Sequence, residues 1–160
     1  MYGAIHRGTA KALVHSLKYE GRKALGRRMG QALARKTVFP AGIDFLLPVP
    51  LHKKSERPYN QALEIARGIS DIWKLPVLDV LQWAREGKRQ VEKSAVERKN
   101  LPEGAVAFSG KQSDLSGKRA LLVDDVSTTG TTLRRCVDAI SQSGVDVRGA
   151  VVWTRVPQKE

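Results

Sequence analysis

Four segments of the chain carry apolar residues at the spacing of an amphipathic helix. In Thr9 to Lys18, and again in Leu133 to Ile140, apolar side chains stand at offsets 0, 3, 4 and 7, which places them on one helix face. Two more helices are expected, over Arg22 to Lys36 and from a capping Asn60 to about Trp73, and Gly144 is expected to cap the last helix. The predicted inward-facing residues are Ala10, Leu13, Val14, Leu17, Leu25, Met29, Ala32, Leu33, Ala62, Ile65, Ala66, Ile69, Trp73, Leu133, Cys136, Val137 and Ile140.

Continuous apolar runs between these helices predict strands. The runs are Asp44–Pro50, Val77–Trp83, Ala105–Phe108, Arg119–Asp125 and Val145–Trp153. Ala120 to Val123 is uninterrupted, as expected for a strand covered on both faces. Strands that alternate with helices are typical of an α/β fold, a parallel sheet flanked by helices on both faces. Residues 85–104 are highly charged, so we expect a long surface loop there that is either functional or disordered.

Charge is distributed unevenly along the chain. Of the formal net charge of +12, residues 1–60 contribute +9, with 12 basic and 3 acidic side chains. Such a surface suits phosphate-bearing partners, either nucleic acid or phosphorylated small molecules, although a solvated basic face is the simpler reading. The single cysteine, Cys136, predicts no disulfide framework and no zinc module in these residues. No signal peptide or membrane-spanning run is visible, so a cytoplasmic protein is expected.

The stretch from Leu121 to Leu133 carries the most informative chemistry. A buried strand ends in Asp124 and Asp125, and a hydroxyl-rich loop with Gly130 then leads into a helix. The N–H groups of such a loop and of the helix N-terminus bind anions, and Gly130 lets a phosphate approach the backbone closely. The two carboxylates can accept hydrogen bonds from vicinal hydroxyls or ligate Mg²⁺. Together these features predict a cradle for a ribose 5-phosphate at the carboxyl end of a strand.

The alternative reading of this stretch is an ordinary helix cap. For Thr131 alone, capping is the better interpretation. For the whole stretch it is not, because two adjacent Asp residues buried at a strand end are costly without a ligand or partner. Neither G-x-x-x-x-G-K-[ST] nor G-x-G-x-x-G occurs in the chain, so the other common phosphate motifs are excluded.

The same stretch resembles the phosphoribosyl-pyrophosphate (PRPP) signature of type I phosphoribosyltransferases, and other segments resemble the ComF/GntX family among them. These segments are Leu47-Pro48-Val49-Pro50-Leu51-His52, Arg57-Pro58-Tyr59-Asn60-Gln61, Leu17-Lys18-Tyr19, and Gln90 with Arg98 and Asn100. The resemblance implies a type I phosphoribosyltransferase-like fold, a mostly parallel twisted sheet flanked by helices with a small N-terminal helical hood. The hood would be residues 1–40 and the α/β domain residues 41–160.

The chain departs from the family pattern in three places. Many members carry an N-terminal cysteine module that binds zinc, and these residues contain none. Pro58 stands where the family usually has Gly, and proline cannot adopt a positive φ. The loop from His52 to Arg57 is also about two residues shorter by alignment. The last two departures bear on how a pyrophosphate would be held.

The resemblance implies binding of PRPP with Mg²⁺ and displacement of pyrophosphate through an oxocarbenium-like transition state. Asp125, Arg57, Arg89 and Lys93 are the expected catalytic residues, with Asp124 and Asp125 as metal ligands. Residues 86–99 would close over the reaction and exclude water. His52 is expected to be structural and Cys136 to lie in the core. The expected PRPP-binding residues are Asp124, Asp125, Val126, Ser127, Thr128, Thr129, Gly130, Thr131, Thr132 and Lys53.

A non-catalytic role is the second hypothesis. The ComF resemblance implies a component of competence and DNA uptake, in which the basic N-terminal segment would contact single-stranded DNA or a partner protein. Few aromatic residues are interleaved with those charges, Tyr2 and Tyr19 being the ones that precede Phe39, so a base-stacking surface is weakly supported. No residue pattern identifies an acceptor base.

Overall fold

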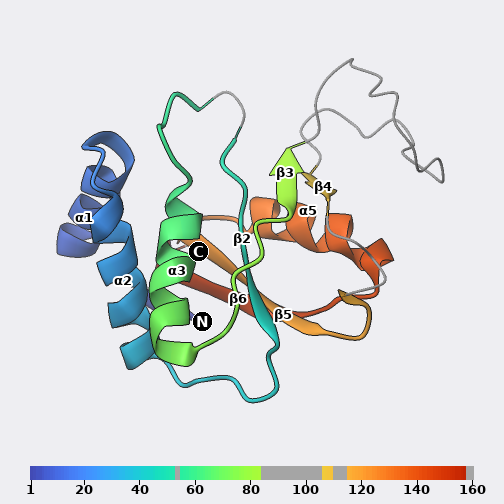
Figure 1. Cartoon of the computed structure of the whole chain (residues 1–160). Helices are drawn as coiled ribbons and strands as arrows, with labels where there is room; N and C mark the ends of the chain where they lie inside the picture. The colour runs from blue at the N-terminus through green and yellow to red at the C-terminus, as the bar shows by residue number, and fades with distance from the viewer. Residues whose placement is uncertain (53–54, 84–105, 110–114, 158–160) are drawn as a thin grey trace.

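A parallel β-sheet organises the chain in the computed structural model (Figure 1). Its strand order is β1-β6-β5-β2, and every neighbouring pair is parallel. The strands are β1 (Tyr2–Ile5), β2 (Phe45–Pro48), β5 (Arg119–Ser127) and β6 (Asp146–Arg155). The structure describes residues 1–52, 55–83, 106–109 and 115–157. The predicted α/β class with a parallel sheet is confirmed.

Helices cover both faces of this sheet. The helices α1 (Gly8–Tyr19), α2 (Lys23–Lys36) and α3 (Gln61–Trp73) lie on one face, and α5 (Thr131–Ile140) lies on the other (Figure 1). Side chains alternate along β5, so Leu121 and Val123 join the core under α1–α3, whereas Ala120 and Leu122 join the core under α5. Within the described part of the chain, no helix is long and apolar enough to cross a membrane.

The helices match the predicted segments to within one or two residues at most ends. Asn60 caps α3 as expected, because its Oδ1 accepts a hydrogen bond of 3.0 Å from the backbone N–H of Ala62. Gly144 does not directly follow α5. A short 3-10 turn over Ser141–Ser143 intervenes, and Gly144 ends that turn with a φ of 74°. The predicted cap is therefore displaced by one turn.

The run Val77–Trp83 is not a strand of the main sheet. Val77 makes an isolated bridge to Leu46, and the chain then leaves the edge of β2. β3 (Leu81–Trp83) instead pairs antiparallel with β4 (Val106–Phe108) in a separate two-stranded sheet. The apolar pattern did not predict this arrangement, because it indicates that the run is buried but not which strand it pairs with.

β1 is an element that the sequence pattern did not predict. It is four residues long, exposed or half-buried throughout, and lies at the edge of the sheet beside β6, with Tyr2 opposite Val152. Short edge strands have no clear hydrophobic alternation, because they have no neighbour on one side and are only partly covered. The first residues of the chain therefore belong to the main sheet.

Two of the predicted inward-facing residues are exposed. Ala32 lies on the surface of α2, because α2 packs on α3 through Gly26, Gly30 and Ala34 instead. Val137 on α5 is 41% exposed, because α5 covers the sheet mainly through Cys136 and Ile140. The other predicted residues of both helices do face the core: Leu25, Met29 and Leu33 on α2, and Leu133, Cys136 and Ile140 on α5.

Candidate functional site

The acidic pair and the hydroxyl-rich loop lie where β5 passes into α5. β5 continues two residues beyond its predicted end, to Ser127, which pairs with Arg155 of β6. The loop then turns at Gly130, whose φ is 75°, and α5 begins at Thr131. The first backbone N–H groups of α5 have no partner within the helix, and they face the loop that precedes it. This edge of the sheet is the one formed by the carboxyl ends of the strands.

A small hollow of about 40 Å³ is present at this turn. Its wall contains Asp124 and the loop with the first turn of α5. The structure thus brings together the predicted PRPP-binding residues that it describes, except Asp125, which does not line the hollow. The lining residues are Asp124, Val126, Ser127, Thr128, Thr129, Gly130, Thr131, Thr132 and Leu133.

Two hydroxyl groups of this region, those of Thr129 and Thr131, are hydrogen-bonded to each other. Thr129 Oγ1 and Thr131 Oγ1 are 2.8 Å apart, and the backbone N–H of Thr131 donates to Thr129 Oγ1 at 3.4 Å. The capping interpretation of Thr131 is wrong, because Thr131 is the first residue of α5 and the N-cap is Gly130, which has no side chain to cap with. The helix N-terminus is therefore not closed by the residue at its cap position.

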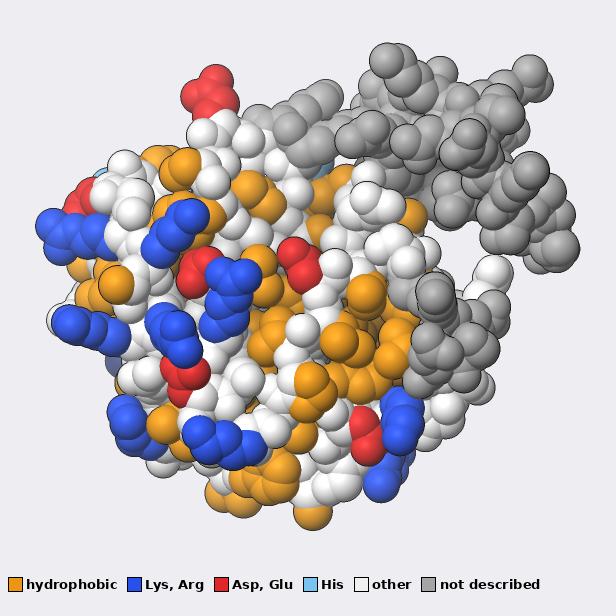
Figure 2. Space-filling view, in the orientation of Figure 1, with side chains coloured by type: hydrophobic (Ala, Val, Ile, Leu, Met, Phe, Trp, Pro, Cys, Tyr) orange, Lys and Arg blue, Asp and Glu red, His pale blue; other side chains and the backbone are white. Residues whose placement is uncertain are grey.

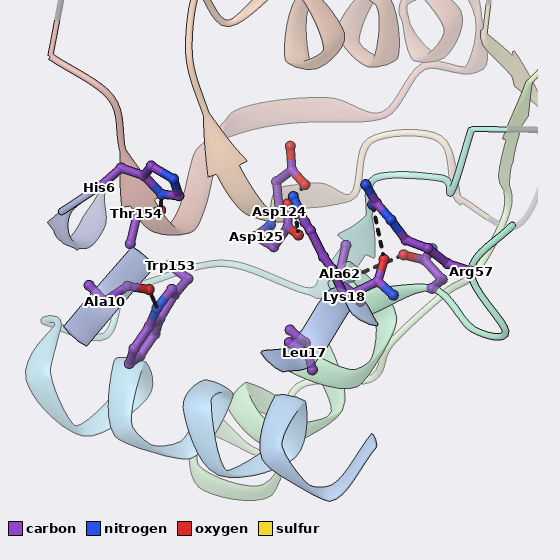
Figure 3. Close-up of polar contacts among 12 residues, drawn as sticks. His6, Ala10, Leu17, Lys18, Arg57, Ala62, Asp124, Asp125, Trp153 and Thr154 are labelled. Carbon is purple, nitrogen blue, oxygen red and sulfur yellow. Dashed lines mark hydrogen bonds and ion pairs between the residues drawn. The ribbon is translucent and has the colours of Figure 1, made fainter. Parts of the chain in front are cut away.

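Asp124 and Asp125 point to opposite sides of β5, as successive residues of a strand do (Figure 3). Asp124 lines the hollow, whereas Asp125 is turned toward the helical face and is 8% exposed. The backbone N–H of Asp125 donates to Asp124 Oδ1 at 2.8 Å. Burial, and next the Asp125 carboxylate, raise the pKa of Asp124 to about 8. The pair is thus a buried carboxylate site in which full ionisation is disfavoured.

Lys18 of α1 provides the nearest positive charge to this pair. Its Nζ lies 2.9 Å from Asp125 Oδ2 (Figure 3). That oxygen is buried and accepts no hydrogen bond of ordinary geometry, so the ammonium offsets its charge without fully satisfying it. Lys18 lies in the Leu17-Lys18-Tyr19 segment that resembles the family, but its contact with Asp125 depends on how α1 packs and could not be derived from residue spacing.

The other predicted catalytic residues are divided between the described and undescribed parts of the chain. Arg57 is half-buried in the loop before α3, and its Nη1 donates to Gln61 Oε1 at 3.3 Å. Lys53, Arg89 and Lys93, with the loop predicted to close over residues 86–99, lie outside the described residues. Their roles stay predictions.

His52 and Trp83 form an aromatic pair near the loop that was predicted to hold pyrophosphate. Their ring centroids are 4.7 Å apart, and Trp83 Nε1 donates to the carbonyl oxygen of Pro50 at 3.0 Å. A ring fixed against a neighbouring ring is consistent with the structural role expected of His52. The pair joins the end of β2 to β3.

A larger groove of about 370 Å³ lies elsewhere, between α5 and β6. Leu133, Val137, Val147 and Ala150 make its wall mostly apolar. Size favours this groove as a ligand site, but chemistry favours the smaller hollow, because a phosphorylated ligand requires convergent N–H and hydroxyl donors. The hollow is therefore the candidate functional site.

A resident metal fits this site poorly. Carboxylate oxygens suit Mg²⁺, but the ammonium of Lys18 already contacts one oxygen of Asp125. Throughout the described segments, no group of three or more His, Cys, Asp or Glu side chains gathers as a metal cage would require. Asp124, which faces the hollow, is the carboxylate better placed to meet a cation that arrives with a ligand.

The parallel sheet, with its acidic pair and a hydroxyl-rich turn at the carboxyl edge, has the arrangement of α/β proteins that bind ligands beyond the carboxyl ends of their strands. The profile of the phosphoribosyl transferase domain matches residues 58–160. The chain belongs to this family, as the resemblance implied.

Two curated proteins show what the chain is similar to. Competence protein F of Haemophilus influenzae is 29% identical over 104 residues, which cover 63% of this chain and 45% of that protein. Orotate phosphoribosyltransferase of Methanopyrus kandleri is 49% identical over 39 residues, 24% of this chain and 21% of that protein. The chain thus matches less than half the length of either relative.

Solved structures confirm the fold. Adenine phosphoribosyltransferase from Thermoanaerobacter pseudethanolicus superposes with a TM-score of 0.51 at 16% identity, covering 82% of this chain and 69% of that chain. Glutamine PRPP amidotransferase from B. subtilis gives a TM-score of 0.50 at 19% identity, covering 79% of this chain and 25% of that chain. The type I phosphoribosyltransferase-like fold is therefore shown.

Proposed function

We propose that this protein binds PRPP as its Mg²⁺ complex and transfers the phosphoribosyl group with release of pyrophosphate. The observation that carries the proposal is the hollow at the β5–α5 turn, where one carboxylate and a hydroxyl-rich loop converge on a volume of about 40 Å³. Membership of the phosphoribosyl transferase family supports the same assignment.

The 5-phosphate is assigned to residues 128–132. The N-terminus of α5 and the loop N–H groups supply donors, and the hydroxyls of Thr129 and Thr131 are ordered beside them. The ribose hydroxyls are assigned to Asp124 and Asp125, because carboxylates accept hydrogen bonds strongly from such groups. The sugar would then lie across the edge of β5, between the hollow and the hood helix α1.

Mg²⁺ enters this account as part of the substrate. When bound, it neutralises charge on the pyrophosphate and so makes pyrophosphate a better leaving group. The protein's own part is to position the sugar and to stabilise charge at the reacting centre. Arg57, with Lys53 from the same loop, is assigned to the pyrophosphate, and Arg89 and Lys93 to the loop that would close over it.

The transfer step breaks the bond between ribose C1 and the pyrophosphate oxygen, whose electron pair leaves with pyrophosphate. A nucleophilic atom of the acceptor then forms the new bond to C1 and loses its proton. The carboxylates near the ribose favour the positive charge that develops on the ring in between. We propose no particular acceptor, because no group of residues in the described part of the chain has the pattern of a base-recognition site.

Isothermal calorimetry with PRPP tests the proposal. The parent should bind PRPP in the presence of Mg²⁺, and chelation of the metal with EDTA should abolish most of the heat. Asp124→Asn should weaken binding about tenfold or more, because the amide replaces one of the two carboxyl oxygens that can accept a hydrogen bond with an NH₂ group that only donates. Asp146→Asn, at the opposite end of the sheet in an exposed ion pair, is the matched control. Equal heats for the parent and Asp124→Asn would contradict the assignment.

Nucleic-acid binding is the second candidate, and the observation behind it is charge. Lys and Arg side chains gather over the face formed by α1–α3 (Figure 2). Some are already paired within the protein, as Arg27 is with Asp71 and Arg22 is with Glu20, which reduces the charge available to DNA. Similarity to a competence protein is the other support.

Filter binding to single-stranded DNA at low and moderate salt separates the two functions. Binding through charge alone should weaken steeply as salt rises, and neutralising the exposed Arg28 and Arg35 should weaken it further. PRPP binding should change little in that double variant. No retention of DNA at low salt would remove this candidate.

A further inference from the structure

Lys18 connects the N-terminal helices to the carboxylate pair through a largely buried contact. Its side chain is 17% exposed, that of Asp125 is 11% exposed, and the charged atoms are 2.9 Å apart. Exposed ion pairs contribute little to stability, but a pair withdrawn from water interacts strongly and leaves a costly charge behind when one partner is removed. The contact therefore constrains both side chains.

The backbone around Lys18 is held in place independently of that ion pair. The hydroxyl of Tyr59 donates to the carbonyl oxygen of Leu17, whose side chain is fully buried. Nearer the start of α1, Trp153 Nε1 donates to the carbonyl oxygen of Ala10 at 3.3 Å (Figure 3). These two bonds join α1 to the loop before α3 and to β6. Lys18 is thus directed at Asp125 by the packing of the whole helix.

We propose that Lys18 is a positioning residue of the sugar site, which fixes the Asp125 carboxylate so that a ribose hydroxyl can bind it. The inference rests on the proposed function, because it assigns Asp125 to the ribose hydroxyls. With Oδ2 held by the ammonium, Oδ1 remains as the acceptor for the sugar. Without Lys18, the Asp125 carboxylate would lose its ion-pair partner and with it its fixed orientation.

This role makes α1 part of the binding site. It also predicts that the protein prefers a sugar with both ribose hydroxyls. A sugar with both ribose hydroxyls gains from a correctly oriented Asp125, whereas 2-deoxyribose lacks one of the two groups. The contribution of Lys18 should therefore appear with ribose 5-phosphate and be small with 2-deoxyribose 5-phosphate. A role limited to holding the fold together would affect both ligands equally.

Calorimetric titration with these two sugar phosphates is the test. For Lys18→Met we expect affinity for ribose 5-phosphate to fall about tenfold, with little change for 2-deoxyribose 5-phosphate. Lys11→Met removes an exposed charge from the same helix and should behave as the parent. Lys18→Arg keeps the positive charge and should restore part of the preference for ribose.

The titration can contradict the role of Lys18 or the proposed function, and the two failures look different. Unchanged affinity of Lys18→Met for ribose 5-phosphate, or an equal fall for both sugars, would overturn the role of Lys18 while leaving the proposed function standing. If the parent bound neither sugar phosphate, the proposed function would itself fail and the inference with it. Should circular dichroism show Lys18→Met unfolded, Lys18→Gln, which retains a polar side chain, is judged by the same criteria.

Discussion

Gly130 and Gly117 share a backbone conformation, but they differ in their place in the molecule. Both have a φ of 75°, and a Cβ added to either would meet nothing within 4 Å. Gly130 lies in the proposed phosphate loop, whereas Gly117 lies in the turn before β5. Alanine substitutions at the two positions therefore distinguish the effect of backbone strain on stability from the effect of an obstructing methyl group on ligand binding.

We expect Gly130→Ala and Gly117→Ala each to lower the free energy of unfolding by about 1 kcal/mol, because an L-residue at positive φ is strained. Only Gly130→Ala should weaken PRPP binding, by about tenfold, since its methyl group keeps a phosphate from the backbone. Urea unfolding and calorimetry measure the two effects. Equal PRPP affinities in the two variants would place the phosphate elsewhere.

The identity of the site residues could be predicted from sequence better than their arrangement. The run from Asp124 to Thr132 was predicted because its chemistry is local and its spacing is set by one strand, one turn and one helix. Asp124 and Asp125 point to opposite sides of β5, because successive side chains of a strand alternate. Residue type alone did not predict this difference between the two carboxylates. Lys18 could not be paired with Asp125 in advance, because that contact depends on tertiary packing.

Close packing of α2 on α3 depends on two glycines. A Cβ at Gly30 would lie 2.0 Å from the carbonyl oxygen of Ile65, and one at Gly68 would lie 2.0 Å from that of Arg27. Neither backbone can move without separating the helices. The contact is completed by Arg27, which makes a two-point ion pair with Asp71 at 2.6 and 2.7 Å.

Gly30→Ala should therefore destabilise the protein by about 3 kcal/mol, the upper part of the usual range for overpacking. Thermal or urea unfolding measures the change. Ala32→Leu adds more bulk to the same helix at an exposed position and should change stability by less than about 0.5 kcal/mol. If the two variants were equally stable, the close approach of the helices would not be a constraint.

Asp71 should make the stability of the α2–α3 pair depend on pH. Hydrogen bonds from Arg27 and Gln31 hold the pKa of Asp71 well below its ordinary value of 3.8. Because the ionised form is favoured in the folded state, this stabilisation is present above pH 4 and is lost as pH falls below it. Asp71→Asn should thus be less stable than the parent at pH 7, with a difference that shrinks toward pH 3.

Urea unfolding of the parent and Asp71→Asn across this range is the measurement. Asp138→Asn, at an exposed position of α5, is the control and should follow the parent. A difference between the parent and Asp71→Asn that is constant from pH 7 to pH 3 would mean that the carboxylate contributes nothing through its charge.

Long elements with strong periodicity could be predicted, and short or edge elements could not. α1, α3 and β5 were recognisable because each buries a continuous face. β1 was missed because a four-residue edge strand has no such face. β3 was not separated from the main sheet because an apolar run does not show which strand it pairs with, and β3 pairs with β4. On α2, apolar periodicity correctly predicted Leu25, Met29 and Leu33 on the buried face and was wrong only for Ala32.

The whole molecule combines a parallel sheet, a hydroxyl-rich turn at its carboxyl edge, and a helical cover that contacts the end of β5 through the Lys18–Asp125 ion pair. The alternation of strands and helices was sufficient to predict the class of fold, and the family match agrees with it. Net charge was less informative, because it describes a surface and part of that surface is neutralised by internal ion pairs.

A crystal structure of the protein with ribose 5-phosphate would show directly where a sugar phosphate binds. We expect the phosphate at the N-terminus of α5, against residues 128–132, with the sugar hydroxyls on the carboxylates of Asp124 and Asp125. A sugar phosphate seated instead in the apolar groove between α5 and β6, or a β5–α5 turn without bound ligand at saturating concentration, would contradict it.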